Sequence, residues 1–173
     1  KKIEKNKFLP GLNQHIGNKP ITILKINKVS KKFHSRFDAK IRTYQYVIIN
    51  RQSPLALQKN KAWHIRKKLD IEAIKKGAKL LLGTHDFSTF RSSSCGAKSP
   101  IKTIKNIFIK KNKDKITIKF TSKSFLQQQV RSMVGCLKYL GEGKWKISDF
   151  KKSFKSKSRI KCAPPAPACG LYL

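Results

Sequence analysis

Acidic residues are scarce in this sequence. Eight Asp and Glu residues stand against 41 Lys and Arg, which gives a formal net charge of +33. Such a surface attracts polyanions through counterion release, so a nucleic acid is the expected partner. A compositional bias toward Lys, Ile and Asn would raise the charge as well, without a functional cause. An anionic membrane surface is the weaker alternative, because the basic residues are spread along the chain instead of gathering on one amphipathic helix.

Long apolar runs are also absent. No stretch approaches the roughly 18 consecutive apolar residues of a membrane helix, and no charged-then-apolar signal peptide opens the chain. We therefore expect no membrane partner and a cytoplasmic location. The first residue is Lys1 and not Met, so we expect the start of the gene product to precede it. The 39% hydrophobic content is ordinary for a globular protein, and 173 residues suffice for one domain plus a fragment of another.

The four cysteines show no metal-binding spacing. None of them forms a C-x-x-C pair, and the four histidines do not cluster with them. This pattern argues against a zinc site, and the sequence predicts no metal and no cofactor. Free thiols in a reducing cytoplasm are the simpler expectation. The cysteines are Cys95, Cys136, Cys162 and Cys169.

Hydrophobic periodicity predicts an α+β fold with a mainly antiparallel sheet flanked by helices. A helix capped by Asp70 is expected to run through Leu82 and to stop at Gly83. A Ser-, Gly- and Thr-rich loop should follow over 84–100, and a shorter basic helix should begin at Ser148 or Asp149. A longer helix is expected over 125–140. Strands are expected over 21–29, 42–49, 102–110 and 115–120, with a hairpin turn at 112–114 between the last two.

Four segments carry a more specific pattern. They read FHSRFDAKIRTYQY over 33–46, GTHDFSTFR over 83–91, FLQQQVRSMVG over 125–135 and GLYL over 170–173. In order and spacing they resemble the TruA-type tRNA pseudouridine synthases, although Gln129 stands where that family usually has Met. The resemblance covers nearly the whole chain. It implies a pseudouridine synthase-like fold, in which residues 1–28 end the N-terminal half and residues 29–173 form the C-terminal catalytic and RNA-binding half.

The resemblance also implies a reaction. Enzymes of this family convert uridine to pseudouridine in the tRNA anticodon stem-loop, with no cofactor and no metal. The target nucleotide must leave the helical stack, and an aspartate then attacks it in a covalent route that divides one difficult step into two. tRNA is the implied partner, and a homodimer is the implied assembly of the full-length protein.

Three positions take catalytic roles by this resemblance. Tyr44 is expected to stack on the flipped base and to assist proton transfer, because unstacked RNA bases are often held by aromatic faces. Arg131 is expected to pair with the nucleophilic aspartate and to orient it, and Leu171 to pack beneath the base. Each position has a plainer alternative. Tyr44 and Leu171 could be core residues, and Arg131 could lie on the solvated side of its helix.

Two further segments are expected to contact RNA, because aromatic side chains interleaved with cations suit combined base and backbone contact. His85 and Asp86 invite a catalytic interpretation, but a polar turn that holds its loop is favoured. The expected RNA-binding residues are Phe33, His34, Ser35, Arg36 and Phe37, and then Ser94, Cys95, Gly96, Ala97 and Lys98.

The nucleophile of the family lies in a segment G-R-T-D-A-G-V-H, upstream of everything seen here. None of the eight acids sits in that motif. Asp38 is superficially similar in context, but the surrounding FHSRF match places it where the family tolerates other residues. The chain by itself is therefore expected to be inactive. A non-catalytic RNA-binding module is the alternative, and the presence of both Tyr44 and Arg131 favours the enzyme, since RNA binding alone does not need that pair.

Overall fold

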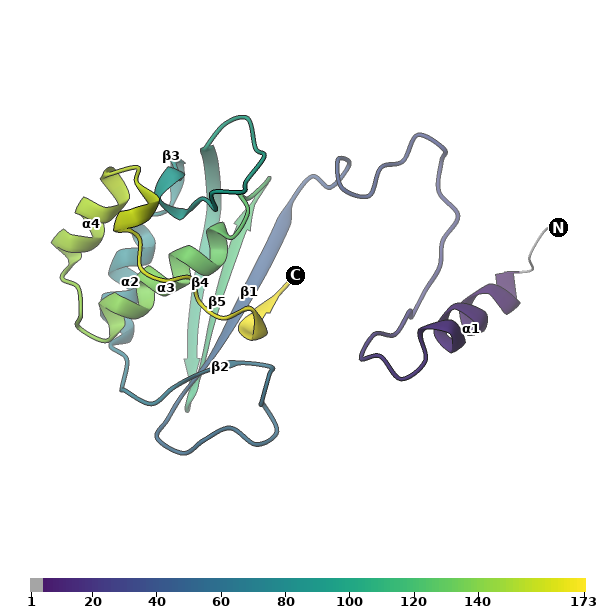
Figure 1. Ribbon diagram of the computed structural model, residues 1–173, viewed down its shortest axis with the longest axis horizontal. Helices are drawn as coiled ribbons and strands as arrows, with labels where there is room; N and C mark the ends of the chain where they lie inside the picture. The colour runs from purple at the N-terminus through teal and green to yellow at the C-terminus, as the bar shows by residue number, and fades with distance from the viewer. Residues whose placement is uncertain (1–4) are drawn as a thin grey trace. The chain divides into compact units, whose positions relative to one another are not determined.

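The computed structural model describes residues 5–173. The chain divides between Asp38 and Ala39 into two compact units. The second unit carries the sheet and most of the buried residues, and it is drawn from blue through yellow in Figure 1.

Over residues 5–38, the first unit contains one helix, α1 (Lys5–Ile16), which includes Pro10. The side chain of Asn13 in this helix pairs with the backbone of Ile23, donating to its carbonyl oxygen at 2.9 Å and accepting from its N–H at 2.8 Å. The prediction of a strand over 21–29 is wrong, because no strand forms there. A strand needs a neighbouring strand for its backbone groups, and at Ile23 a side-chain amide fills that need.

The second unit is built on a six-stranded sheet with the order β2-β1-β5-β4-β3, in which β6 also pairs with β1. The β1–β2 pair is parallel and the other pairs are antiparallel. The prediction of an α+β fold with a mainly antiparallel sheet is therefore confirmed. The strands are β1 (Arg42–Asn50), β2 (Trp63–Ile65), β3 (Gly83–Asp86), β4 (Ile101–Asn112), β5 (Lys115–Ser122) and β6 (Leu171–Tyr172).

Three α-helices pack on one face of this sheet: α2 (Ile71–Lys79), α3 (Gln129–Gly141) and α4 (Ile147–Lys155) (Figure 1). Alternate residues of the strands point toward the helices, as the two-residue period of a strand requires. Together with the helices they bury one continuous core, which includes Tyr46, Ile48, Ile118, Phe120, Ile74, Met133, Leu137 and Phe150.

The opposite face of the sheet is more polar. The hydroxyls of Thr43 and Thr121 hydrogen-bond across the β1–β5 pair at 3.0 Å. A small apolar cluster of Val47, Ile49 and Ala62, with Leu55 packed against it, lies where the segment between β1 and β2 returns. This second cluster explains why β1 is buried on both faces near its end.

Several boundaries differ from the sequence prediction. The helix expected from residue 125 begins at Gln129, because Gln128 adopts a left-handed backbone (φ 61°) and the Gln129 side chain accepts the N–H of Leu126 at 2.7 Å. The loop expected over 84–100 begins with β3 and a single 3₁₀ turn, η1 (Ser88–Phe90), because Thr84 pairs with Thr103 of β4. The short strand β2 was not predicted, since three residues are too few for a periodic signal.

Other local predictions are confirmed. The carboxylate of Asp70 caps α2 by accepting the N–H groups of Glu72 and Ala73 at 2.8 and 3.1 Å, although the helix ends at Lys79 and not at Leu82. The hairpin turn lies between Asn112 and Lys115. The short basic helix forms as α4, one residue before the expected start.

Candidate active site

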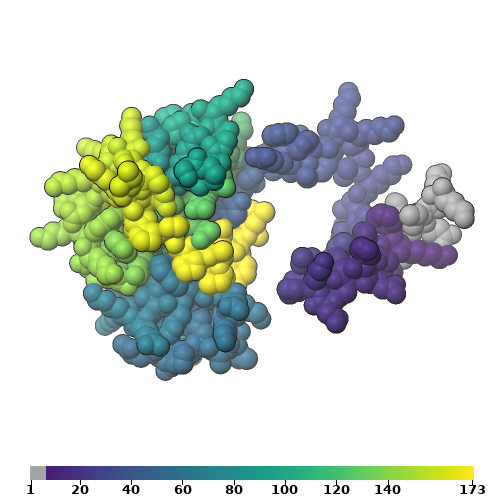
Figure 2. Space-filling model, in the orientation of Figure 1, coloured from purple at the N-terminus to yellow at the C-terminus, as the bar shows by residue number. Residues whose placement is uncertain are grey.

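The C-terminal segment 163–172 passes close to both α3 and β1. Two glycines permit this approach. A Cβ on Gly135 of α3 would lie 2.0 Å from the Pro164 carbonyl oxygen, and a Cβ on Gly170 would lie 2.7 Å from the Val47 carbonyl oxygen. The end of the chain, yellow in Figure 2, thereby reaches β1, and there it forms β6.

Tyr46 is the residue on which this region is assembled. Its side chain is fully buried, and its hydroxyl donates to the Pro167 carbonyl oxygen at 2.6 Å. Its backbone pairs with Leu171 of β6. Burial raises the pKa of the Tyr46 hydroxyl, Cys169 adds to the rise, and the positive charge of Arg131 partly offsets it. Tyr46 is therefore a neutral anchor for the segment that carries Leu171.

Arg131 lies in the first turns of α3 and is half-buried. It forms two hydrogen bonds with Ala166: the Ala166 N–H donates to the Arg131 carbonyl oxygen at 2.9 Å, and the Arg131 Nε donates to the Ala166 carbonyl oxygen at 2.6 Å. The first bond ties the backbone of α3 to the C-terminal segment, and the second fixes one edge of the guanidinium. In the described part of the chain, its two terminal nitrogens have no hydrogen-bonding or acidic partner.

Tyr44 lies on β1 two residues before Tyr46, so both rings lie on the same face of the sheet. The Tyr44 ring is half-buried and meets Phe125 edge to face, with the ring centroids 5.3 Å apart. Its hydroxyl has no hydrogen-bond partner among residues 5–173. The aromatic body is thus held by the core while the polar end remains available.

Tyr44 lies two residues before Tyr46 on β1, Leu171 pairs with Tyr46 across β1 and β6, and Arg131 bonds Ala166 in the same C-terminal segment. Within the described residues no hydrogen bond joins the three directly. The predicted site residues did not include Tyr46, Phe125 or Ala166, although Tyr46 and Phe125 lie in the segments that resemble the family. The Pro-rich stretch CAPPAPA was the available signal, because prolines lack a backbone N–H and keep the segment out of a helix or a regular strand ladder. Its carbonyl oxygens instead accept from the side chains of Tyr46 and Arg131.

The expected RNA-binding loop 94–98 adjoins this region. Arg91 holds it by donating to the carbonyl oxygens of Cys95 and Ala97 at 2.6 and 2.8 Å. The N–H of Gln127, two residues beyond Phe125, contacts the Cys95 sulfur at 3.4 Å. Ser94, Gly96 and Lys98 are exposed and Ala97 is half-buried. The Cys95 side chain is buried, so this residue can meet RNA only through its backbone.

The thiol of Cys95 lies in a polar setting despite its burial. Burial alone would raise its pKa, but the N–H groups of Ala97 and Gln127 and the guanidinium of Arg91 outweigh that effect, and the pKa lies below its ordinary value. All four cysteines are free thiols, as the sequence predicted.

The other expected RNA-binding segment, residues 33–37, belongs to the first unit. It forms a tight turn in which the His34 N–H donates to the Asp38 carboxylate at 2.9 Å and the Asp38 N–H donates back to the His34 carbonyl oxygen at 2.9 Å. The rings of His34 and Phe37 lie 4.2 Å apart, and the Arg36 guanidinium lies over the Phe37 ring. Phe33 and Phe37 are exposed, so the turn presents aromatic and cationic groups together.

His85 and Asp86 end strand β3 and do not form a turn, but they hold the segment that follows, as the sequence favours. The Asp86 carboxylate accepts from the Ser88 N–H at 2.9 Å and from the Ser88 hydroxyl at 2.6 Å, and the His85 ring hydrogen-bonds the Leu82 carbonyl oxygen at 2.7 Å. These contacts fix the entry to η1.

The described acids all have local partners, and none of these partners is Arg131. Glu4 lies outside the described residues. Asp70 and Asp149 bond backbone N–H groups at helix starts. The others pair as Asp38 with His34, Glu72 with Lys75, Asp86 with Ser88 and Lys157, Asp114 with Arg51, and Glu142 with Lys138. In residues 5–173, no group of three or more His, Cys, Asp and Glu side chains could hold a metal ion.

Comparison with known proteins decides the family. A family model described as tRNA pseudouridine synthase matches residues 78–173. The tRNA pseudouridine synthase A of Pelagibacter ubique is 60% identical over 168 residues, which are 97% of this chain and 68% of that protein. The chain belongs to the tRNA pseudouridine synthase family. The tRNA pseudouridine synthase A of Maricaulis maris is 40% identical over the whole of this chain, and the match spans 70% of that relative.

Not every relative is covered to the same extent. The tRNA pseudouridine synthase A of Paramagnetospirillum magneticum is 47% identical over 94% of this chain, and the match spans 63% of that protein. The family match includes Arg131, Leu171 and the loop 94–98, while Tyr44 lies in the part that the relatives alone cover. Within the described residues, none of the helices has the length and apolar character needed to cross a membrane.

Proposed function

We propose that this chain supplies the C-terminal, RNA-binding half of a tRNA pseudouridine synthase that isomerises uridine in the tRNA anticodon stem-loop. One observation supports this above all others. The half-buried Tyr44 and Arg131 each keep an unpartnered polar end within the described residues, and both lie beside the C-terminal segment that carries Leu171. Neither polar end is among the buried side-chain atoms that lack a partner, so both are open to solvent and available to a ligand.

Arg131 is suited to hold a carboxylate. Its Nε is already bonded to Ala166, so the guanidinium is oriented before any ligand arrives. The remaining nitrogens of its planar fork match the two oxygens of a carboxylate. In this proposal the nucleophilic aspartate comes from a G-R-T-D-A-G-V-H segment upstream of residue 1. Residues 1–28 then end the N-terminal half, and residues 29–173 form the C-terminal half.

Tyr44 and Leu171 are suited to hold the flipped uracil. The reaction breaks the bond between N1 of uracil and C1′ of the ribose, turns the base, and joins C5 to C1′, after which C5 must lose its proton. An aromatic face beside the base keeps it in place during this rotation. In this proposal the Tyr44 hydroxyl, which has no hydrogen-bond partner among the described residues, assists the proton transfer, and Leu171 would supply apolar contact beneath the ring.

The substrate would be held by the exposed turn 33–37 and by the loop 94–98. The resemblance adds a homodimer for the full-length protein, and this remains a prediction. Because base flipping costs a few kcal/mol, these contacts would have to compensate for it with phosphate and stacking interactions.

The proposal is tested by two substitutions in a protein extended to the length of its relatives. Tyr44→Phe keeps the aromatic face, so tRNA affinity should hardly change, because stacking of roughly 1–3 kcal/mol per base is preserved. Turnover should fall by about 10²–10⁴-fold if the hydroxyl moves a proton. Arg131→Ala should strongly reduce turnover while keeping most of the phosphate-dominated affinity. Single-turnover pseudouridine formation and tRNA binding are the measurements.

Tyr139→Phe is the matched control, since Tyr139 lies on α3 outside the site, packed against Trp145. It should leave turnover unchanged. Normal turnover in Tyr44→Phe would remove the proton-transfer role, and normal turnover in Arg131→Ala would remove that residue from the site. Circular dichroism must accompany the assay, because loss of the folded state in Arg131→Ala would indicate a structural role instead.

A further inference from the structure

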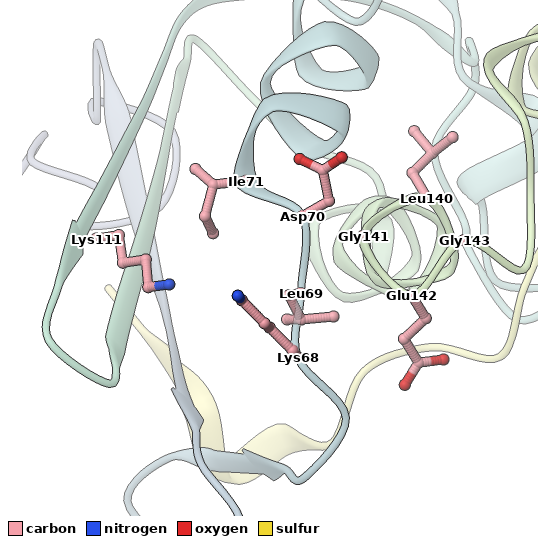
Figure 3. A pocket seen from close by; sticks show the side chains of 9 residues that line it. All are labelled: Lys68, Leu69, Asp70, Ile71, Lys111, Leu140, Gly141, Glu142 and Gly143. Carbon is pink, nitrogen blue, oxygen red and sulfur yellow. The ribbon is translucent and has the colours of Figure 1, made fainter.

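A cavity of about 540 Å³ lies where the start of α2, the end of α3 and the strand β4 meet. Figure 3 shows Lys68 and Lys111 extending into it, with their ammonium groups directed toward one another. Neither ammonium group has a hydrogen bond or an ion pair with any residue in the described range. Two like charges that converge without a counter-charge repel each other, so the arrangement favours an anion between them.

Both lysines stand on a fixed frame, and Asn50 at the end of β1 provides it. Its side-chain amide donates to the carbonyl oxygens of Ile65 and Lys67 at 2.8 and 2.7 Å, and its oxygen accepts the N–H of Leu69 at 3.0 Å. The Asn50 N–H donates to the Asp114 carbonyl oxygen at 2.7 Å. One residue therefore anchors the segment that carries Lys68 and the hairpin next to Lys111.

The floor of the cavity is equally fixed. The Asp70 N–H donates to the Gly141 carbonyl oxygen at 2.8 Å, which joins the start of α2 to the end of α3. A Cβ on Gly141 would lie 2.7 Å from Ile74 and 3.2 Å from Leu69, so these elements are in close contact. The two lysines therefore project from a preformed surface.

The acids that line the cavity do not neutralise these lysines. One oxygen of the Asp70 carboxylate, Oδ1, accepts the N–H groups of Glu72 and Ala73, and the Glu142 carboxylate lies 2.8 Å from Lys138 and 3.6 Å from Lys144. In Figure 3 both carboxylates are directed away from Lys68 and Lys111. Since Asp70 already caps α2, the attraction for an anion comes from the lysines and not from the helix end.

We infer that this cavity binds a phosphate group of the tRNA backbone, as a second contact apart from the site around Tyr44 and Arg131. Lys ammonium groups bind phosphate as point charges with three donors each. Further exposed cations flank the two lysines. Arg66 and Lys67 directly precede Lys68, and Lys113 lies in the hairpin turn just beyond Lys111. Such flanking cations suit a polymer with regularly spaced phosphates better than a single free ion.

The cavity is well separated from the candidate active site. Arg131 and Gly141 lie near opposite ends of α3, and a rise of about 1.5 Å per residue places them roughly 15 Å apart along the helix axis. A tRNA whose anticodon stem-loop reached Tyr44 could therefore contact Lys68 and Lys111 only through another part of its backbone. The inference rests on tRNA binding, as in the proposed function, but not on catalysis.

Lysine acetylation footprinting of the purified protein tests the inference without a substitution. Mass spectrometry measures the reactivities of Lys68 and Lys111 in three samples: the protein alone, the protein with unmodified tRNA, and the protein with inorganic phosphate. Lys151 and Lys152, which are exposed on α4, serve as internal controls. We expect tRNA to protect Lys68 and Lys111 more than the α4 pair, and inorganic phosphate at the same concentration to protect neither.

A matched pair of double variants supplies a second measurement. The double variant Lys68→Ala, Lys111→Ala should weaken tRNA binding severalfold. The dependence of log K on log salt should become shallower, its slope falling in magnitude by about one, as expected for the loss of one phosphate contact. Lys151→Ala with Lys152→Ala removes the same charge and should have a smaller effect on both quantities.

The outcomes separate this inference from the proposed function. Normal tRNA binding without protection of Lys68 and Lys111, or equal effects of the two double variants, would overturn the phosphate site and leave the proposed function standing. Equal protection by inorganic phosphate would assign the cavity to a free anion and would overturn the RNA assignment. Absence of any tRNA binding would refute the proposed function together with this inference.

Discussion

At the scale of single residues, the position of Arg131 depends on a glycine that never touches it. Gly135 lets the Pro164 carbonyl come against α3, and this approach brings Ala166 within hydrogen-bonding distance of both the backbone and the Nε of Arg131. A side chain at residue 135 would therefore displace the partner that orients the guanidinium, although α3 itself would tolerate an alanine well.

Gly135→Ala should accordingly destabilise the protein by about 1–3 kcal/mol, the usual cost of overpacking a close contact. It should also lower turnover in the full-length enzyme, because the 163–167 segment must move. Urea unfolding and single-turnover assays measure the two effects. Gly96→Ala is the control for stability, since nothing lies within 4 Å of a Cβ there, and its unfolding free energy should change by less than about 1 kcal/mol. Equal stabilities of the two variants would contradict the close approach at Gly135.

At the scale of elements, the segment from β3 to η1 is held by one carboxylate. Asp86 bonds the Ser88 N–H and hydroxyl and lies 3.4 Å from the Lys157 ammonium group. Burial opposes ionisation, but the Ser88 hydrogen bonds and Lys157 outweigh it, and the pKa of Asp86 lies below its ordinary value of 3.8. The segment leads to Arg91, so this carboxylate helps to place the residue that holds the loop 94–98.

This pKa shift predicts a pH dependence of stability. A carboxylate with a lowered folded-state pKa stabilises the protein above its unfolded-state pKa, and the contribution is lost as the pH falls through the folded-state value. Asp86→Asn keeps an oxygen for Ser88 but removes the charge. The wild-type protein should therefore be more stable than Asp86→Asn at pH 7, and the difference should shrink below about pH 4. Urea unfolding at both pH values measures it, and a difference that stays constant with pH would contradict the role of the charge.

At the scale of the whole molecule, charge dominates the expected behaviour. The formal net charge of +33 is distributed over both compact units, and few of the cations have acidic partners because only eight acids are present. Most of the basic side chains therefore remain available to phosphates.

tRNA affinity should consequently fall steeply with salt, with log K decreasing by roughly 0.7–0.9 per unit of log salt for each neutralised phosphate. Fluorescence anisotropy with labelled tRNA between about 50 and 200 mM salt measures this slope. A flat dependence would show that the charge reflects composition and not a binding surface.

The sequence by itself determined the features that depend on local patterns. Strict alternation in 115–120 predicted β5, the carboxylate of Asp70 predicted the start of α2, and four ordered motifs indicated the family. Local pattern was misleading at 21–29, where apolar alternation suggested a strand. Strand formation depends on a neighbour, and at Ile23 the amide of Asn13 takes the neighbour's place.

Only the tertiary structure decided how distant segments meet. Tyr44, Arg131 and Leu171 are separated by long stretches of chain, and their gathering depends on the buried hydroxyl of Tyr46, the carbonyl of Pro167 and the close approach at Gly135. The convergence of Lys68 and Lys111 likewise depends on the hydrogen bonds of Asn50. These contacts form between residues that no local period relates, because close packing and the satisfaction of buried polar groups act through space and not along the sequence.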